Sequence, residues 1–162
     1  MALTSEQLQT LKAAILADPV LNAQGLDGDG LNFVADAMNA VLVPNYIVWR
    51  TAVPIDDIMR NGMDWARVDN LSTGKARIWD WMSRLGTFNP SKTNIRAGID
   101  AAWVGTAADL AVRALIYTHC KRPATRAEKL LGDQAAGTDA APGTMTFEGN
   151  ITAGQVDMAR RS

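Results

Sequence analysis

The sequence predicts an all-α fold: a helical bundle of about five to six helices with an extended C-terminal tail and a short β segment. Three observations lead to this prediction. Apolar residues recur at the three- and four-residue spacing of amphipathic helices, helix-capping sequences precede several of these stretches, and the composition changes to small, flexible residues after Gly132. The 162 residues, 48% of them hydrophobic, are enough for one domain with a modest core.

The first half of the chain predicts two helices, an extended segment and a short helix. Thr4 and Gln7 form a capping box before a helix over residues 5–17. A second helix follows the sequence "LDGDG" and ends before Pro44. Residues 45–53 are rich in β-branched and aromatic types, which favours an extended segment, and residues 54–62 then form a short helix closed by glycine.

The second half predicts three longer helices, near residues 71–85, 92–104 and 107–121, with residues 63–74 leading into them as a loop. Thr106 is the expected N-cap of the last of these helices.

After Pro123 the pattern becomes weaker. Thr125 and Glu128 form a capping box that opens a short helix ending near Leu131. Residues 132–144 are small and carry few large apolar side chains, which is typical of a linker. We therefore predict a helical domain over residues 1–131 and a flexible linker and tail over residues 132–162. The tail contains a β-prone piece at residues 145–148 and a terminal turn of helix.

Two sequence features resemble functional sites, a calcium-binding loop and a catalytic His–Cys pair, but neither has the residues or the geometry that the site requires. Asp27 and Asp29 match the start of a calcium-binding loop, but Leu31 and Met38 occupy positions that need oxygen ligands. His119 and Cys120 are the only histidine and the only cysteine, and neighbours on a helix point about 100° apart, so the imidazole cannot easily activate the thiol. We expect no enzyme activity, no metal site and no cofactor.

A cluster of basic residues is the strongest candidate contact site. Residues 1–43 carry one lysine against five acids, whereas residues 87–132 carry seven basic residues against three acids. The densest part of the cluster contains Lys121, Arg122, Arg126 and Lys129. These side chains can contact phosphate or an acidic protein surface, or form a solvated joint between two helices.

Trp79 and Trp81 lie two positions apart, so they cannot both face the core, and one of them suits an interface.

Three stretches of the chain carry a resemblance to a known group of proteins. They are "VWRTAVPIDDIMRNGMDWARVDNLSTGKARIWDWM", "NPSKTNIRAGIDAAWVG" and "HCKRPATRAEKLLG" continued by "PGTMTFEG". Together, residues 45–150 resemble small helical proteins encoded with the virion genes of tailed bacteriophages, in the head-to-tail connector or neck. The likeness extends over whole segments and includes no catalytic motif.

The resemblance implies a structural virion protein of the phage neck, assembled in the host bacterial cytoplasm and free of membranes. Adaptors of this kind form a ring, commonly a dodecamer, that joins the portal protein to tail or neck proteins and surrounds the channel through which packaged DNA passes. An arm or tail of each copy engages the portal or the next ring. We expect Met145, Phe147 and Ile151 to make such tail contacts.

The same residues also fit other functions. The basic cluster also suits a nucleic-acid-binding packaging protein, similar to a small terminase subunit, whose affinity would fall steeply with salt. Another minor virion protein, such as a stopper, would share the same helical pattern. The sequence does not separate basic residues that face DNA from basic residues that face another subunit.

Overall fold

The computed structural model describes residues 2–132 and 135–162, and the chain forms two compact units. Unit 1 contains Met1–Val48 and Pro123–Ser162, and unit 2 contains Trp49–Arg122. The sequence predicted a boundary between residues 131 and 132, with a tail after it. The boundaries of the units lie elsewhere, after Val48 and after Arg122, and the C-terminal segment belongs to the same unit as the N-terminal helices. Unit 2 is therefore inserted into the sequence of unit 1.

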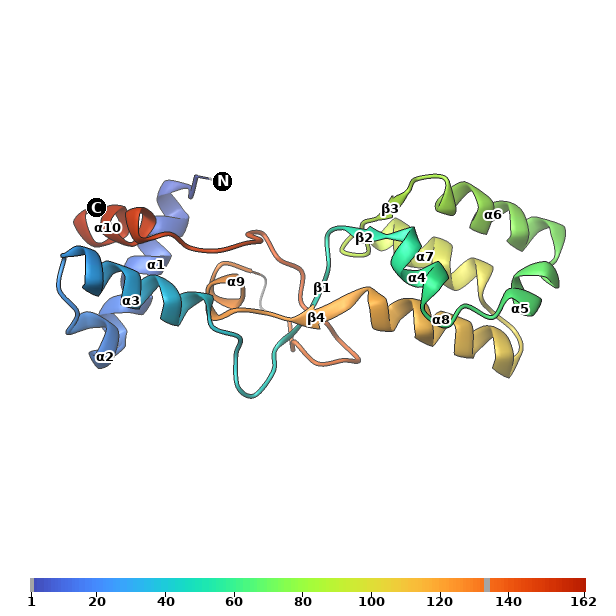
Figure 1. Ribbon diagram of the computed structural model, residues 1–162, viewed down its shortest axis with the longest axis horizontal. Helices are drawn as coiled ribbons and strands as arrows, with labels where there is room; N and C mark the ends of the chain where they lie inside the picture. Colours follow the sequence, from blue (N-terminus) through green and yellow to red (C-terminus); the bar gives the residue numbers. More distant parts are fainter. Residues whose placement is uncertain (1, 133–134) are drawn as a thin grey trace. The chain divides into compact units, whose positions relative to one another are not determined.

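Unit 1 is built from helices at both ends of the chain. Its described helices are α1 (Ser5–Ala17), α2 (Pro19–Asn22), α3 (Gly28–Asn39), α9 (Arg126–Leu130) and α10 (Ala153–Arg161). The C-terminal helix α10 packs beside α1 and α3, as Figure 1 shows. The apolar faces of these helices meet in one core, in which Leu11, Ile15, Val34 and Met38 are fully buried.

The predicted C-terminal tail is part of the core of unit 1. Phe147, Ile151 and Val156 are buried among the residues of α1 and α3. The side-chain amide of Asn39, at the end of α3, donates to the carbonyl oxygen of Ile151 at 2.8 Å and accepts from its amide at 2.7 Å. Burial of these apolar side chains, together with a paired backbone, holds the segment in place.

The predicted linker also has fixed partners where it is described. The Tyr46 hydroxyl donates to the carbonyl of Ala135 at 2.9 Å. Ile47 donates its amide to the carbonyl of Gly137 and accepts from the amide of Gly143, at 2.7 and 2.9 Å. Residues 135–144 are thus tied to the segment around Ile47. Residues 133–134 of the predicted linker lie outside the described part of the chain.

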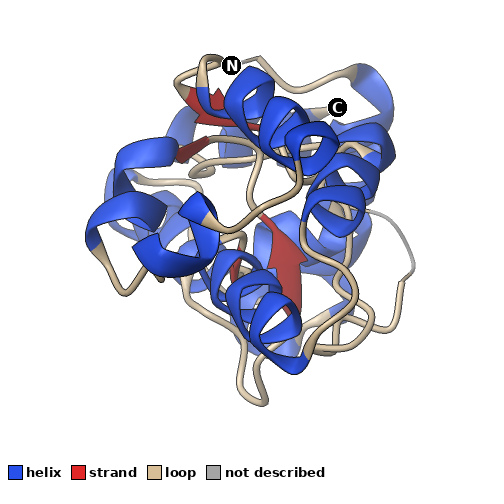
Figure 2. Cartoon of the chain, turned by 90° about the vertical axis from the view of Figure 1, so that its right-hand side faces the viewer, coloured by secondary structure: helices blue, strands red, loops and turns tan. Residues whose placement is uncertain are grey.

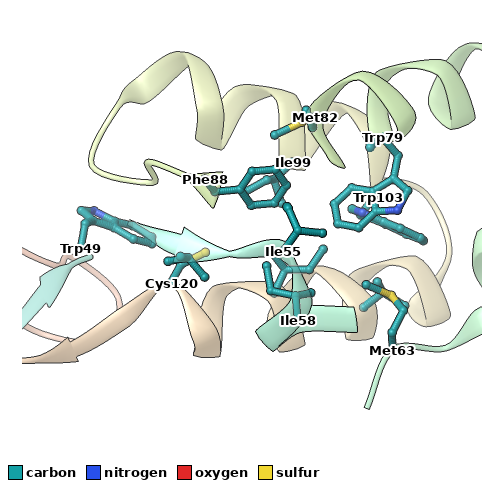
Figure 3. Packing of buried hydrophobic residues seen from close by; sticks show 14 residues of the cluster. Trp49, Ile55, Ile58, Met63, Trp79, Met82, Phe88, Ile99, Trp103 and Cys120 are labelled. Atoms are coloured by element: carbon teal, nitrogen blue, oxygen red, sulfur yellow. The ribbon is translucent and has the colours of Figure 1, made fainter. Parts of the chain in front are cut away.

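Unit 2 has its own core, formed mainly by four of its helices. In order along the chain, its elements are β2 (Val53–Pro54), α4 (Ile55–Arg60), α5 (Trp65–Asp69), α6 (Thr73–Ser83), β3 (Thr87–Phe88), α7 (Thr93–Ala102) and α8 (Ala107–His119). Figure 3 shows the packing of this core, in which Trp79 lies edge-on to Trp103 with ring centroids 5.3 Å apart. Phe88, from β3, also lies edge-on to Trp79.

Two small sheets accompany the helices. β2 pairs with β3 in antiparallel fashion, and β1 (Ile47–Trp49) pairs with β4 (Lys121–Pro123) at the two places where the chain passes between the units. Ten helices are present in the described residues, where five to six were predicted. The fold is therefore dominated by helices but is not purely all-α, as Figure 2 shows.

The predicted helix starts are confirmed where a capping box supports them. Thr4, Thr106 and Thr125 each cap a helix and accept a hydrogen bond from the backbone amide three residues later. The "LDGDG" sequence lies at the start of α3. Asp27 is the cap, its carboxylate accepts from the Gly30 amide, and Asp29 lies in the first turn. Caps satisfy free helix amides by short-range bonds, which is why the sequence reveals them well.

Candidate interaction surfaces

The four basic residues of the predicted contact site do not belong to one unit. Lys121 and Arg122 fall in unit 2, whereas Arg126 and Lys129 fall in unit 1. Arg126 and Lys129 line one pocket of unit 1, but the structure does not define one surface from all four residues. The reason is that β4 crosses the boundary between the units immediately after Arg122.

Lys121 contributes to an aromatic and cationic cluster in unit 2. Its Nζ lies 5.5 Å from the ring centroid of Trp49 and 5.9 Å from that of Tyr117. The guanidinium carbon of Arg96 lies 5.0 Å from the Trp49 centroid. Cations over aromatic faces are attracted by the ring quadrupole. Since Trp49 itself is buried, this cluster stabilises the start of unit 2, and the Trp49 ring is not open for stacking with a nucleic-acid base.

The two basic residues in unit 1 have partners as well. An Arg126 guanidinium nitrogen lies 2.8 Å from a carboxylate oxygen of Asp18, and the hydrogen bond from Arg126 is the main cause that lowers the pKa of Asp18. The Lys129 ammonium lies 5.1 Å from the ring centroid of Tyr46. Both cations are thus held by intramolecular contacts, which reduces what they can gain from an external phosphate.

The three predicted tail-contact residues are buried. Met145, Phe147 and Ile151 retain only a few per cent of their accessible surface, because they fill the interior of unit 1. They cannot contact another protein while unit 1 is folded. The sequence carried one signal for this arrangement, a capping box at Thr152 and Gln155 that opens α10.

Cys120 is a buried core residue of unit 2. Burial raises the pKa of its thiol to about 12, so the reactive thiolate is scarce at neutral pH. His119 ends α8, and its carbonyl oxygen accepts from Arg50 at 3.1 Å. No cluster of three or more potential metal-ligating acids, histidines or cysteines occurs in residues 2–132 and 135–162.

Asp109 is a buried carboxylate that joins several segments of unit 2. Arg67, on α5, donates a hydrogen bond to it, and Lys75 of α6 lies 3.9 Å from its second oxygen. That oxygen also accepts from the Thr106 amide at 3.1 Å within the capping box of α8. The Arg67 guanidinium, followed by the Thr106 amide, lowers the pKa of Asp109 to about 2. Sequence analysis did not single out this residue.

Replacing Asp109 by asparagine is expected to destabilise the chain at neutral pH. Since the folded-state pKa lies below its ordinary value of 3.8, the carboxylate stabilises the fold above about pH 4. This contribution is lost as the pH falls towards 2. The urea unfolding midpoint should therefore fall between neutral pH and pH 2 in the parent chain, and this fall should be smaller in Asp109→Asn. Asp69→Asn, at an exposed acid, is the control, and equal behaviour of the two variants would contradict the assignment.

Large apolar side chains are exposed on both units. In unit 2 they include Trp65, Trp81, Leu85, Val104 and Leu110. In unit 1 they include Leu16, Val20, Leu26, Phe33, Val41, Val43 and Met158. Exposed aromatic residues are unusual on a surface without partners, because tryptophan and phenylalanine are enriched in interfaces.

The two units carry opposite net charge. Unit 1 contains ten acidic and five basic residues, a formal charge of −5, whereas unit 2 contains seven acidic and eleven basic residues, a formal charge of +4. The charge of −1 for the whole chain hides this separation.

No family profile, curated protein or solved structure matches the chain. Among the described residues, no helix combines the length and the apolar character needed to cross a lipid bilayer.

Proposed function

We propose that this chain is a structural protein of the phage neck, an adaptor that forms a ring with copies of itself and joins the portal to tail components without performing chemistry. The observation that carries this proposal is the pairing of two compact units with opposite charge and exposed aromatic residues. The resemblance of residues 45–150 to neck proteins supplies the biological setting.

A ring needs two different complementary surfaces on each subunit. Subunits related by rotation meet head to tail, so one face of each copy must fit another face of the next. An acidic unit and a basic unit in one chain meet this requirement, since opposite charges favour the correct pairing and disfavour like against like. Closure of the ring then strengthens weak contacts through effective concentration.

The contacts with the portal must come from exposed faces of the folded units and not from a free C-terminal arm. A free arm was the first expectation, but residues 145–162 are committed to unit 1. The exposed apolar residues of both units remain available for neighbouring virion proteins.

Imaging of assembled particles tests this proposal directly. A gold-labelled antibody against the chain should bind at the neck of purified virions, and native mass spectrometry of the chain with the portal protein should detect a joint complex. Purified virions that lack the chain, or a label located elsewhere on the particle, would refute the proposal.

The charge of unit 2 favours one alternative, a nucleic-acid-binding packaging protein. This alternative requires duplex DNA binding that weakens steeply with salt. An electrophoretic shift assay at several ionic strengths separates the two functions. Failure to retain duplex DNA at low salt would remove the packaging alternative.

A further inference from the structure

Two exposed helix faces, one in each unit, carry the same spacing with opposite charge. On α6, Trp81 is flanked by Arg77 four residues before it and, three residues after it, by Arg84, the C-cap of the helix. On α3, Phe33 is flanked by acids at the same two positions, Asp29 and Asp36. Residues three and four apart lie on one face of a helix, so each aromatic ring lies between two like charges.

Both faces point away from the cores of their units. Trp81 is 62% exposed and Phe33 is 47% exposed, and the four charged residues around them are exposed too. The opposite face of α6 contributes Trp79 and Met82 to the core of unit 2, as Figure 3 shows. The opposite face of α3 contributes buried residues to unit 1.

We propose that the Arg77, Trp81 and Arg84 face of α6 docks on the Asp29, Phe33 and Asp36 face of α3 in a second copy of the chain. Contact of the two aromatic rings would remove apolar surface from water at the centre. The two arginines would then meet the two aspartates on either side. Arginine suits this contact because its planar guanidinium binds carboxylates with two parallel hydrogen bonds.

Charge complementarity identifies the partner as a second copy. The α3 helix contains no basic residue, and the unit that carries it has a net charge of −5, while the unit that carries α6 has a net charge of +4. Like faces would repel one another, so α6 against α6 and α3 against α3 are both disfavoured. The contact is therefore heterologous and can continue from copy to copy.

Other charges near the two faces leave this complementarity intact. Asp80 pairs with Arg84 at 2.9 Å, but both side chains are exposed, and an exposed pair one turn apart on a helix contributes little. The guanidinium carbon of Arg77 lies 5.9 Å from the Trp81 centroid, which places this cation beside the aromatic ring. Near the start of α3, Arg160 is engaged by the carbonyl oxygens of Gln24 and Gly25.

A charge exchange tests the contact. One variant carries Asp29→Arg and Asp36→Arg, and the other carries Arg77→Asp and Arg84→Asp. Each variant alone should self-associate at least about tenfold more weakly than the parent chain, measured by sedimentation across a concentration series, because like charges now face each other. In an equal mixture, both contacts between unlike variants join opposite charges, so association should return and can continue from copy to copy.

The controls separate charge from folding. Arg60→Asp with Lys92→Asp makes the same change of charge in unit 2 at exposed positions outside α6, and should leave association unchanged. Circular dichroism checks that each variant is folded. If a double variant unfolds, Asp36→Arg and Arg77→Asp, which lie away from the first turn of α3 and the last turn of α6, are measured singly in the same way.

This inference rests on the self-assembly in the proposed function, and the outcomes distinguish the two. A parent chain that assembles while folded charge-reversal variants assemble equally well would overturn the α3 and α6 contact alone. A mixture of folded variants that remains monomeric would also overturn it. A parent chain that stays monomeric at every concentration would overturn both the contact and the self-assembly.

Discussion

Removal of residues 145–162 is expected to unfold unit 1. The deleted segment supplies five buried side chains, Met145, Phe147, Ile151, Val156 and Ala159. Truncating one large buried apolar residue costs about 2–5 kcal/mol, and a whole domain is stable by only about 5–15 kcal/mol. The loss of this segment therefore exceeds the stability available to unit 1.

Hydrogen exchange resolved by peptide measures this effect unit by unit. Peptides from α1 and α3 should lose protection in the truncated chain, whereas peptides from unit 2, which has its own core, should retain it. A point variant gives a milder test with a matched control. Val156→Asp introduces a charge into the core, while Met158→Asp lies on the exposed face of the same helix. Protection of α1 and α3 that survives the truncation would show that the segment is dispensable.

Local signals in the sequence identified much of the secondary structure. The helix that begins after Thr4 starts where its capping box predicts, and the helix that begins after Thr106 starts at its predicted N-cap, because a cap involves only residues three apart. The α5 helix was missed, although Asp64 caps it by accepting from the Arg67 amide. Its five residues are too few to show an apolar period.

Contacts between distant parts of the sequence could not be predicted in the same way. The amide of Asn39 holds Ile151 across 112 positions of the chain, and neither residue signals its partner. The small residues after Gly132 suggested a linker, yet glycine at position 137 is also what permits the backbone to lie against the Tyr46 ring. Composition alone does not separate a flexible segment from one that is packed closely against another.

The predicted basic contact site also depends on contacts that the sequence does not show. Arg122 and Arg126 are neighbours in sequence, but the boundary between the units falls between them, so sequence proximity did not define a surface. The charge and spacing around Phe33 and Trp81 are visible in the sequence. The sequence does not show which side chains are buried, and burial decides whether Trp79 or Trp81 faces outward.

Replacing Trp79 by alanine is expected to destabilise unit 2 by about 3–5 kcal/mol. Its ring is 4% exposed and makes edge contacts with Trp103 and Phe88, so its removal leaves a cavity beside these two aromatic residues. Trp81→Ala, two positions away on the same helix, should change the free energy of unfolding by no more than about 0.5 kcal/mol, since that side chain is mostly in solvent. Chemical unfolding followed by circular dichroism measures both values.

The same pair of variants separates folding from assembly. Trp81→Ala should remain folded yet self-associate more weakly, because it removes the central ring of the proposed contact. Trp79→Ala that retains the stability of the parent chain would contradict the packing of unit 2. If Trp81→Ala proves as destabilising as Trp79→Ala, then Trp81 supports the fold, and its exposed ring is not reserved for a partner. Equal association of Trp81→Ala and the parent chain would leave the arginines of α6 as the only part of that face able to recognise a second copy.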